Sequence, residues 1–324
     1  MRAKHFYLLV PMLGSVIFDT TAAYGQNYPV KPVRIVAPEP GGGADLVARI
    51  VAQGLSVGLG QPALVDNRGG SAIIPAEIVA KAPPDGYTLL FSANAHWLLP
   101  LFQANVPYDP LNDYAPIAVT TTSPVVIAVH PSLPVKSVKE LITLAKLRPG
   151  VINCTSGTMG STTFLSAELF KAAAGVNITT IPYKGAGPAL NATAGGQVDM
   201  IAITASSVMP HVRQGRLRAL AVASAQPSAL APGLPTAGAA GLPAYITGTT
   251  HGIFAPAKTP EAIILRLNQE IVRFLNRPDT KEKLSGSGLE TVGGSPADLT
   301  STIKSEVARI GKMIKDAGIK TGAG

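Results

Sequence analysis

Residues 34–45 read RIVAPEPGGGAD, a short β-branched run that ends in a proline- and glycine-rich turn. An amphipathic helix is predicted to follow over residues 44–59, because its apolar residues recur with helical spacing. The chain repeats this plan at VINCTSGTMGS, residues 151–161, which also leads into a predicted helix. The first backbone N–H groups of a helix have no partner within it, and the helix dipole favours negative charge there. The two units therefore predict two anion-binding turns in two halves of one chain.

Strands and helices are predicted to alternate along most of the chain, which is the pattern of a parallel α/β sheet. Short β-branched runs such as residues 125–129 are typical of buried strands. A proline-rich stretch, residues 227–243, predicts a surface loop. Apolar residues with helical spacing predict two C-terminal helices, around residues 263–274 and 299–314. These helices have no predicted sheet of their own, so we expect them to pack back onto the first part of the chain.

The expected fold class is α/β with two domains, since about 300 mature residues exceed one hydrophobic core of ordinary size. We predict a discontinuous first domain from residues 26–122 plus 250–324, and a second α/β domain, residues 123–249, inserted into it. The two crossovers between them would form a hinge with a cleft alongside. Ligands of open α/β sheets bind at the carboxyl ends of strands, which this arrangement places in the cleft.

The first 25 residues have the order of an export signal. Two basic residues precede an apolar run at residues 6–18, and small residues follow near a cleavage site. The run is shorter than the roughly 20 residues that a membrane span needs. The single cysteine, Cys154, excludes an internal disulfide and lies far from any lipid-attachment position. We therefore expect a soluble periplasmic protein with a cleaved signal peptide and without a lipid anchor.

The charge pattern argues against nucleic acid as a partner. The chain carries 27 Lys and Arg against 19 Asp and Glu, yet the basic residues are dispersed and only 5% of residues are aromatic. There is no basic run and no stacking platform for bases. Scattered histidines and one cysteine lack metal-ligand spacing, so no metal and no cofactor is predicted. The dinucleotide, Walker A, nucleophile-elbow and zinc-helix motifs are also absent from the sequence, which favours a binding protein over an enzyme.

Candidate ligand-binding residues lie at the glycine-rich turns and at the ends of predicted strands. Glycines let the backbone approach a ligand, whereas Asp45 is expected to cap the helix, order the loop or accept an ammonium group. Arg68 is a candidate for neutralising a ligand charge, with pairing to Asp66 as the alternative. Hydroxyls such as Ser161 can cap a helix or bind a carboxylate. The predicted set is Gly41, Gly42, Gly43, Ala44, Asp45, Arg68, Ser92, Asn94, Ser156, Gly160, Ser161, Thr162 and Thr204.

Nine short segments, each weak alone, are specific in their order and spacing. They are YPVKPVR (28–34), PGGGAD (40–45), DNR (66–68), PDGYTLL (84–90), PYDP (107–110), PYKG (182–185), GGQVD (195–199), GRLRALAV (215–222) and AP (255–256). Through them essentially all of the mature chain resembles the tripartite tricarboxylate transporter substrate-binding proteins, the Bordetella uptake gene (Bug) family.

This resemblance implies a two-domain Venus-flytrap fold of the periplasmic binding class, type II, with a small carboxylate held in the interdomain cleft. It implies delivery to the membrane permease subunits of a tripartite tricarboxylate transporter. It also assigns residues 40–45, the first glycine-rich turn, and residues 156–162, the second glycine-rich turn, to opposite sides of the cleft. Two alternatives stay open: a receptor that presents its ligand to a sensor kinase, and an exported hydrolase that uses Ser161 or Ser92.

The chain departs from the family pattern at four places expected near the cleft. Pro38 replaces a usual Phe, Phe164 a frequent His, and Thr250 a common Trp. The loop after Arg68 is one residue shorter than usual. The resemblance therefore implies the fold and the ligand class, and it does not transfer the identity of a particular carboxylate.

Overall fold

The computed structural model describes residues 28–38, 40, 43–69, 72–157, 161–183 and 185–316, so the predicted export signal lies outside the described residues. The strands are β1 Val33–Ala37, β2 Ala63–Asn67, β3 Thr88–Ala93, β4 Tyr114–Val129, β5 Asn153–Ser156, β6 Thr179–Pro182, β7 Met200–Thr204, β8 Arg218–Val222, β9 Gly248–Pro256 and β10 Glu290–Thr291. The helices are α1 Gly43–Leu59, α2 Ile73–Ala80, α3 Ala95–Leu98, η1 Leu99–Leu101, α4 Val138–Leu147, α5 Thr162–Ala174, α6 Ala186–Ala194, α7 Ala205–Arg213, α8 Glu261–Leu275, α9 Pro278–Gly286 and α10 Pro296–Asp316.

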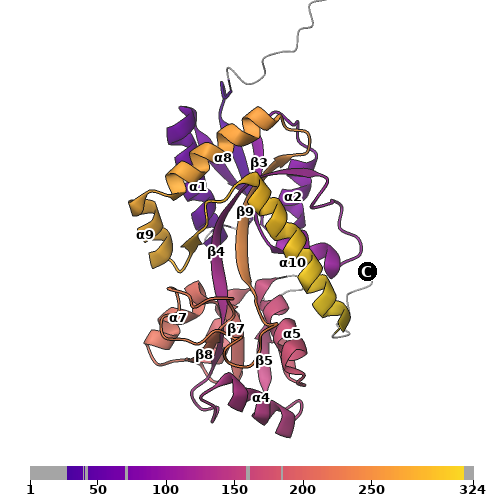
Figure 1. The fold of residues 1–324 in the computed structure, drawn as a ribbon, viewed down its shortest axis with the longest axis vertical. Coiled ribbons are helices and arrows are strands. Elements are labelled where there is room, and N and C mark those ends of the chain that lie inside the picture. Colours follow the sequence, from indigo (N-terminus) through magenta and orange to yellow (C-terminus); the bar gives the residue numbers. More distant parts are fainter. Residues whose placement is uncertain are drawn as a thin grey trace, which may run out of the picture.

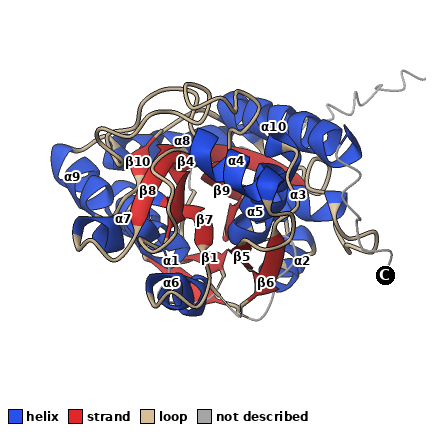
Figure 2. Ribbon diagram, turned by 90° about the horizontal axis from the view of Figure 1, so that it is seen from below, coloured by secondary structure: helices blue, strands red, loops and turns tan. Residues whose placement is uncertain are grey.

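The molecule consists of two α/β lobes, one above the other, joined through one mixed sheet (Figure 1). The strand order is β2-β1-β3-β9-β4-β7-β5-β6, and β10 and β8 also pair with β4. Helices lie on both sides of the strands (Figure 2). No described helix is long and apolar enough to cross a membrane.

Lobe 1 contains β1, β2, β3, β10, most of β9 and the first part of β4. Side chains alternate along β1, so Val33 and Ile35 enter one buried cluster with α1 and α8, whereas Val36 enters another with α2 and α10. Burial on both faces explains why β1 is apolar except at Arg34, which is only partly buried.

Lobe 2 contains β5 to β8 and the second part of β4, which lies between β7 and β8. The same alternation sends Val126 and Ala128 into a cluster with α6 and α7. Ile127 and Val129 face the other way and pack with α4 and α5. Each lobe therefore has helices packed on two faces of its part of the sheet.

Two strands pass from one lobe to the other. β4 is a 16-residue strand that runs from lobe 1 into lobe 2, and β9 returns antiparallel to it. The domain boundaries predicted at residues 122/123 and 249/250 fall within these two strands, and this division stays a prediction. Helix α10 lies beside the crossing and contacts both α3 of lobe 1 and α5 of lobe 2.

The two C-terminal helices pack back onto the first part of the chain as predicted, since α8 contacts α1 and α10 contacts α3. Residues 248–256 and 290–291 add β9 and β10 to the sheet. One prediction about the later part of the chain is wrong. The proline-rich loop, residues 227–243, is not confined to the surface, because Ala231, Ala237 and other apolar side chains of this loop are buried. A proline-rich segment without a helix or strand period gives no sign that its small side chains fill the core of lobe 2.

Candidate functional site

Strand directions place four strand ends opposite one another. β1 is parallel to β3, and β3 is antiparallel to β9, so β1 and β3 both run toward lobe 2. β7 is antiparallel to β4 and parallel to β5, so β5 and β7 run toward lobe 1. The carboxyl ends of these four strands therefore face each other between the lobes, where open α/β sheets bind ligands. Predicted site residues lie at or directly after the ends of β3, β5 and β7, and Gly43 lies six residues after the end of β1.

The first glycine-rich turn is tied to the neighbouring strand through Asp45. This residue, in the first turn of α1, is only 7% exposed. Its Oδ1 accepts a hydrogen bond from Asn67 Nδ2 at 3.0 Å, and its Oδ2 accepts one from Arg49 Nε at 3.1 Å. Asn67 Nδ2 also donates to the carbonyl oxygen of Pro38 at 2.8 Å. The start of α1, the end of β2 and the residue after β1 are thus joined by side-chain bonds. Gly41 and Gly42 lie outside the described residues, whereas Gly43 and Ala44 form the start of α1.

Arg68 follows β2 and pairs with a carboxylate of its own lobe. Its Nε lies 3.0 Å from Asp66 Oδ1, and Arg34 binds the same carboxylate from β1. Burial acts to raise the pKa of Asp66, but the bonds from Arg34 and Arg68 outweigh this effect and lower the pKa. Asp66 is therefore ionised at neutral pH, and the Arg68 side chain, which is half exposed, is already partly neutralised.

Asn94 and Thr162 meet at β9, although they come from different lobes. Asn94 Nδ2 donates to the carbonyl oxygen of Gly248 at 2.8 Å, and its Oδ1 is buried without a partner among the described residues. Thr162 Oγ1 lies 3.1 Å from Thr249 Oγ1. Both residues line one small cavity beside α10. Ser92, two residues before Asn94, is buried within β3 opposite Gly252 of β9.

The second glycine-rich turn is held by uncharged groups. Ser161 Oγ accepts a hydrogen bond from the backbone N–H of Phe164 at 3.2 Å and caps α5. Ser156 is buried and donates to Gly157 O at 3.3 Å. Thr204 ends β7, and its hydroxyl bonds to Ser206 and Ser207 at the start of α7. Gly160 lies outside the described residues.

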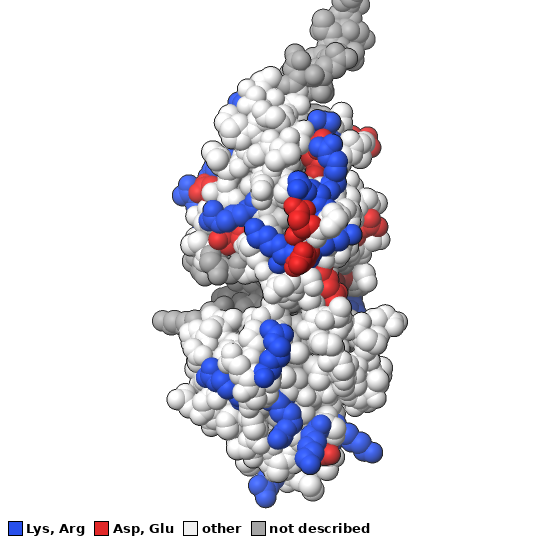
Figure 3. Space-filling model, turned by 90° about the vertical axis from the view of Figure 1, so that its left-hand side faces the viewer, with Lys and Arg blue, Asp and Glu red and all other residues white. Residues whose placement is uncertain are grey.

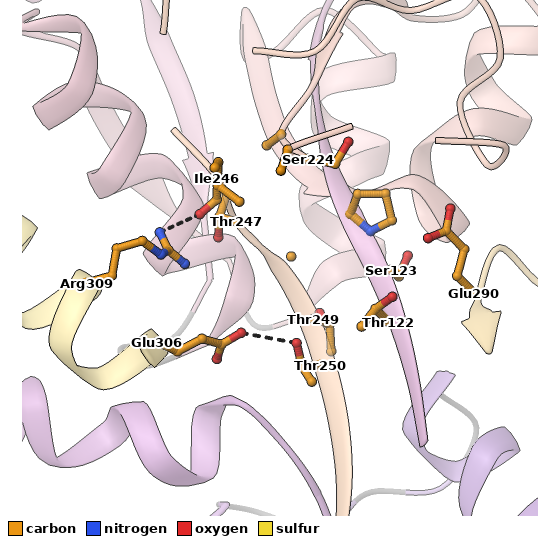
Figure 4. Close-up of a pocket in the computed structure, with 14 residues that line it drawn as sticks. Thr122, Ser123, Ser224, Ile246, Thr247, Thr249, Thr250, Glu290, Glu306 and Arg309 are labelled. Carbon is orange, nitrogen blue, oxygen red and sulfur yellow. Dashed lines mark hydrogen bonds between the residues drawn. The ribbon is translucent and has the colours of Figure 1, made fainter. Parts of the chain in front are cut away.

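Two charged residues of α10 enter the region between the lobes, and sequence reasoning did not select them. They line a cavity of about 200 Å³ at the crossing of β4 and β9 (Figure 4). Glu306 accepts hydrogen bonds from Trp97 Nε1 at 2.8 Å and from Thr250 Oγ1 at 3.2 Å. Arg309 Nη1 donates to the carbonyl oxygen of Ile246 at 2.6 Å. Burial raises the pKa of Glu306, although both hydrogen bonds act to lower it.

A signal for Glu306 exists in the sequence. The apolar stripe of α10 contains Ile303 and Ile310, and a carboxylate three residues after the first and four before the second lies on the same side of the helix. A charged residue within an apolar stripe has to find partners, and here Trp97 and Thr250 supply them. Thr250, at a position where the family often has Trp, thus bonds with α10. Phe164, another departure from the family, packs edge to face on Phe102.

In many serine hydrolases a histidine beside the nucleophile acts as its base. Among the residues with described positions, no hydrogen bond joins Ser92 or Ser161 to a histidine. His251 Nδ1 lies 3.0 Å from Thr121 Oγ1, and burial lowers its pKa to about 4. His96 is fully buried among aromatic rings, and burial lowers its pKa to about 3. Across the described ranges no group of three His, Cys, Asp or Glu side chains is arranged to hold a metal ion.

Comparisons with known proteins agree on one family. Residues 47–319 match the family described as "Tripartite tricarboxylate transporter family receptor". The chain is 34% identical to protein BugT of Bordetella pertussis over 302 residues, which cover 91% of this chain and 92% of BugT.

Two solved structures from Rhodopseudomonas palustris are also similar to this chain. Rpa4515 with adipate is 38% identical with a TM-score of 0.81, covering 90% of this chain and 98% of that one. MatC with bound malate is 31% identical with a TM-score of 0.78, covering 89% of this chain and 100% of that one. The likeness therefore extends over both lobes.

Proposed function

The chain belongs to the tripartite tricarboxylate transporter receptor (Bug) family, and from this premise we propose that it captures a small carboxylate between its lobes in the periplasm. Its two-lobed α/β fold is that of the type II periplasmic binding proteins. We further propose that the loaded receptor delivers its ligand to the membrane subunits of a tripartite tricarboxylate-type transporter. The relatives with adipate and malate support a dicarboxylate as the ligand class.

The observation that carries the proposal is the opposed set of strand ends. Two of these four ends, those of β1 and β5, lead through a glycine-rich turn into a helix start. A helix start offers unpaired N–H groups and the positive end of the dipole, which together suit a carboxylate.

The two connecting strands, β4 and β9, are the proposed hinge for closure of the lobes. In the proposed mechanism, small backbone changes in β4 and β9 near residues 122–124 and 248–250 swing lobe 2 toward lobe 1. The ligand favours the closed form because it satisfies, on both sides, N–H groups that face water in the open form. Domain boundaries at residues 122/123 and 249/250 are part of this proposal.

The residues proposed to line the site are those at the four strand ends. Gly43 and Ala44 would contribute through backbone N–H groups, and Ser161 and Thr162 through hydroxyls or N–H groups. Asp45 would keep the first turn in shape through Asn67 rather than touch a carboxylate. Gly41, Gly42, Arg68, Ser92, Asn94, Ser156, Gly160 and Thr204 complete the proposed set.

The test is calorimetry on the mature chain with adipate and malate, each beside its dimethyl ester as a matched uncharged control. We expect saturable binding of at least one dicarboxylate and none of its ester. Native mass spectrometry of the gently purified protein provides a second readout, because a co-purified ligand is released on denaturation. Failure of a broad panel of mono-, di- and tricarboxylates to bind or to shift the melting temperature would contradict the proposal.

A further inference from the structure

The two lobes differ sharply in charge. Residues 123–249 contain nine Lys and Arg against three Asp and Glu, whereas residues 26–122 and 250–324 together contain 16 against 15. On the face shown in Figure 3, both signs interleave over the upper lobe, and Lys and Arg dominate the lower one. The excess positive charge of the mature chain thus belongs almost entirely to lobe 2.

The acidic residues of lobe 2 leave most of this charge uncompensated. Glu168 pairs with Lys171 at 2.9 Å on α5. Asp199 accepts a hydrogen bond from the backbone N–H of Asn153, and Glu140 accepts one from that of Lys136. Within the described part of lobe 2, Glu168 and Lys171 form the one ion pair between side chains.

The unpaired cations gather at the end of lobe 2 that points away from lobe 1. β4 ends there, and β5, β7 and β8 begin there, as their directions require. Helix α4 lies at this lower end of the molecule (Figure 1). The exposed cations of α4, of the segments beside it and of the turn before β8 are Lys136, Lys139, Lys146, Arg148 and Arg216.

Two large apolar side chains project from the same end. Leu147 is 75% exposed and Val151 is 60% exposed, and Lys146 and Arg148 flank Leu147. The turn that carries them is ordered, since Gly150 N–H donates to the carbonyl oxygen of Asn177 at 2.9 Å. Protein surfaces that lie in a membrane interface combine exposed apolar side chains with cations in the same way.

We propose that this end of lobe 2, formed by Lys136, Lys139, Lys146, Leu147, Arg148 and Val151, docks on an anionic lipid bilayer. The cations lie near headgroup phosphates, and the two apolar side chains enter the interface. A bilayer suits this surface because the cations are spread over the narrow end of the molecule. Fluid lipid headgroups can rearrange around such cations, so no fixed complementary shape is needed. None of these six residues belongs to the proposed ligand site.

The experiment is co-sedimentation of the mature chain with vesicles at low salt. Vesicles of phosphatidylglycerol mixed with phosphatidylcholine are compared with vesicles of phosphatidylcholine alone. We expect binding to the first kind only, and release at high salt. The double variant Lys146→Gln/Arg148→Gln should bind roughly 20- to 30-fold more weakly, about fivefold for each cation removed. Leu147→Ser alone should weaken binding severalfold through the lost apolar contact.

The matched control is Lys281→Gln/Lys283→Gln, which removes the same charge from exposed positions of α9 in lobe 1. It should bind vesicles like the parent chain, and the melting temperature of each variant shows whether it is folded. Equal losses in both double variants, or equal binding to neutral vesicles, would overturn the proposal. The lipid proposal would also be overturned if the parent chain did not bind anionic vesicles. If Lys146→Gln/Arg148→Gln still lowered ligand uptake in cells, the result would favour an acidic protein as the partner of this surface.

Discussion

The two glycine-rich turns begin from the same strand–turn–helix plan and end in different chemistry. In lobe 1 the start of α1 carries an acidic side chain, Asp45, which Asn67 and Arg49 hold in place. In lobe 2 the start of α5 carries only the neutral cap Ser161. A carboxylate near a helix start offsets part of the dipole that would attract an anion. We therefore propose that the two turns differ in role: Asp45 fixes the shape of the first turn, and the start of α5 attracts the carboxylate more strongly than the start of α1.

The largest effect is expected from Asp45→Ala, which tests the ordering role assigned to lobe 1. The substitution removes a buried carboxylate that accepts from two side chains, so we expect a loss of about 1.5–3 kcal/mol in the free energy of unfolding. Ligand affinity should fall at least tenfold as the first turn loses its fixed shape. Urea unfolding and calorimetry measure the two effects.

Glu77→Ala serves as the control for Asp45→Ala, because the Glu77–Lys81 pair is largely exposed. Its removal should cost less than about 1 kcal/mol and leave affinity unchanged. If Asp45→Ala behaved like this control, the first turn would be ordered by other contacts, and the contrast between the lobes would fail.

Ser161→Asp makes the second turn resemble the first. Asp is as good a helix cap as Ser, so stability should stay within about 0.5 kcal/mol of the parent chain. A full negative charge at the start of α5 should lower the affinity for a carboxylate by about tenfold or more. Ser161→Ala, which removes the cap without adding charge, should instead cost about 1 kcal/mol of stability. Unchanged calorimetric affinity in Ser161→Asp would show that the ligand does not approach α5.

Glu306→Gln tests the contact of α10 with the crossing strands through its pH dependence. Burial raises the pKa of Glu306 in the folded chain above its ordinary value of 4.5. The folded state therefore binds the proton more readily than the unfolded state, and this group adds stability as pH falls from the raised pKa toward 4.5. That contribution is complete below the unfolded pKa and is lost as pH rises through the folded pKa. The variant should lack it.

The measurement for Glu306→Gln is the difference in melting temperature between variant and parent from pH 7 to pH 4. The difference should favour the variant most at pH 7 and shrink on acidification, since the other carboxylates are common to both proteins. A difference that does not change with pH would mean that Glu306 titrates normally and is not desolvated at the crossing.

The smallest effect is expected from Arg68→Gln. Its guanidinium already pairs with Asp66, which Arg34 also binds, so we expect a loss of ligand affinity below about fivefold. Arg34→Gln, on the same carboxylate, is the matched comparison. A loss well above tenfold in Arg68→Gln alone, measured by calorimetry, would place Arg68 on the ligand and shift part of the charge attraction to lobe 1.

The parts of the fold that could be predicted from sequence are those with a strong local period. The helix after the first turn was expected over residues 44–59 and begins one residue earlier, at Gly43. Strand β4 was predicted only at residues 125–129, because Pro116 and Pro124 argue against a strand over its first part. The place of β9 between β3 and β4 could not be predicted, because both partners lie far away in the sequence.

For the site, sequence gives residue types at strand ends but not their partners. The Asp45–Asn67 bond depends on the parallel register that sets Ala37 beside Asn67, and no local pattern encodes that register. The contact between Glu306 and Trp97 joins residues 209 positions apart. Such contacts follow from tertiary packing, so a single sequence can suggest a buried charge on α10 without showing which side chains satisfy it.

Strand β9 has a consequence for how the chain acquires its structure. It lies between β3 and β4, yet it is formed by residues 248–256, after every strand of lobe 2. For a chain that emerges from its amino end, the edge of β3 stays open and the sheet of lobe 1 stays split until about four fifths of the protein is available. Lobe 2 can assemble its own strands in the meantime. The slowest step of folding is then expected to be the late insertion of β9, with α8 and α10 closing over it.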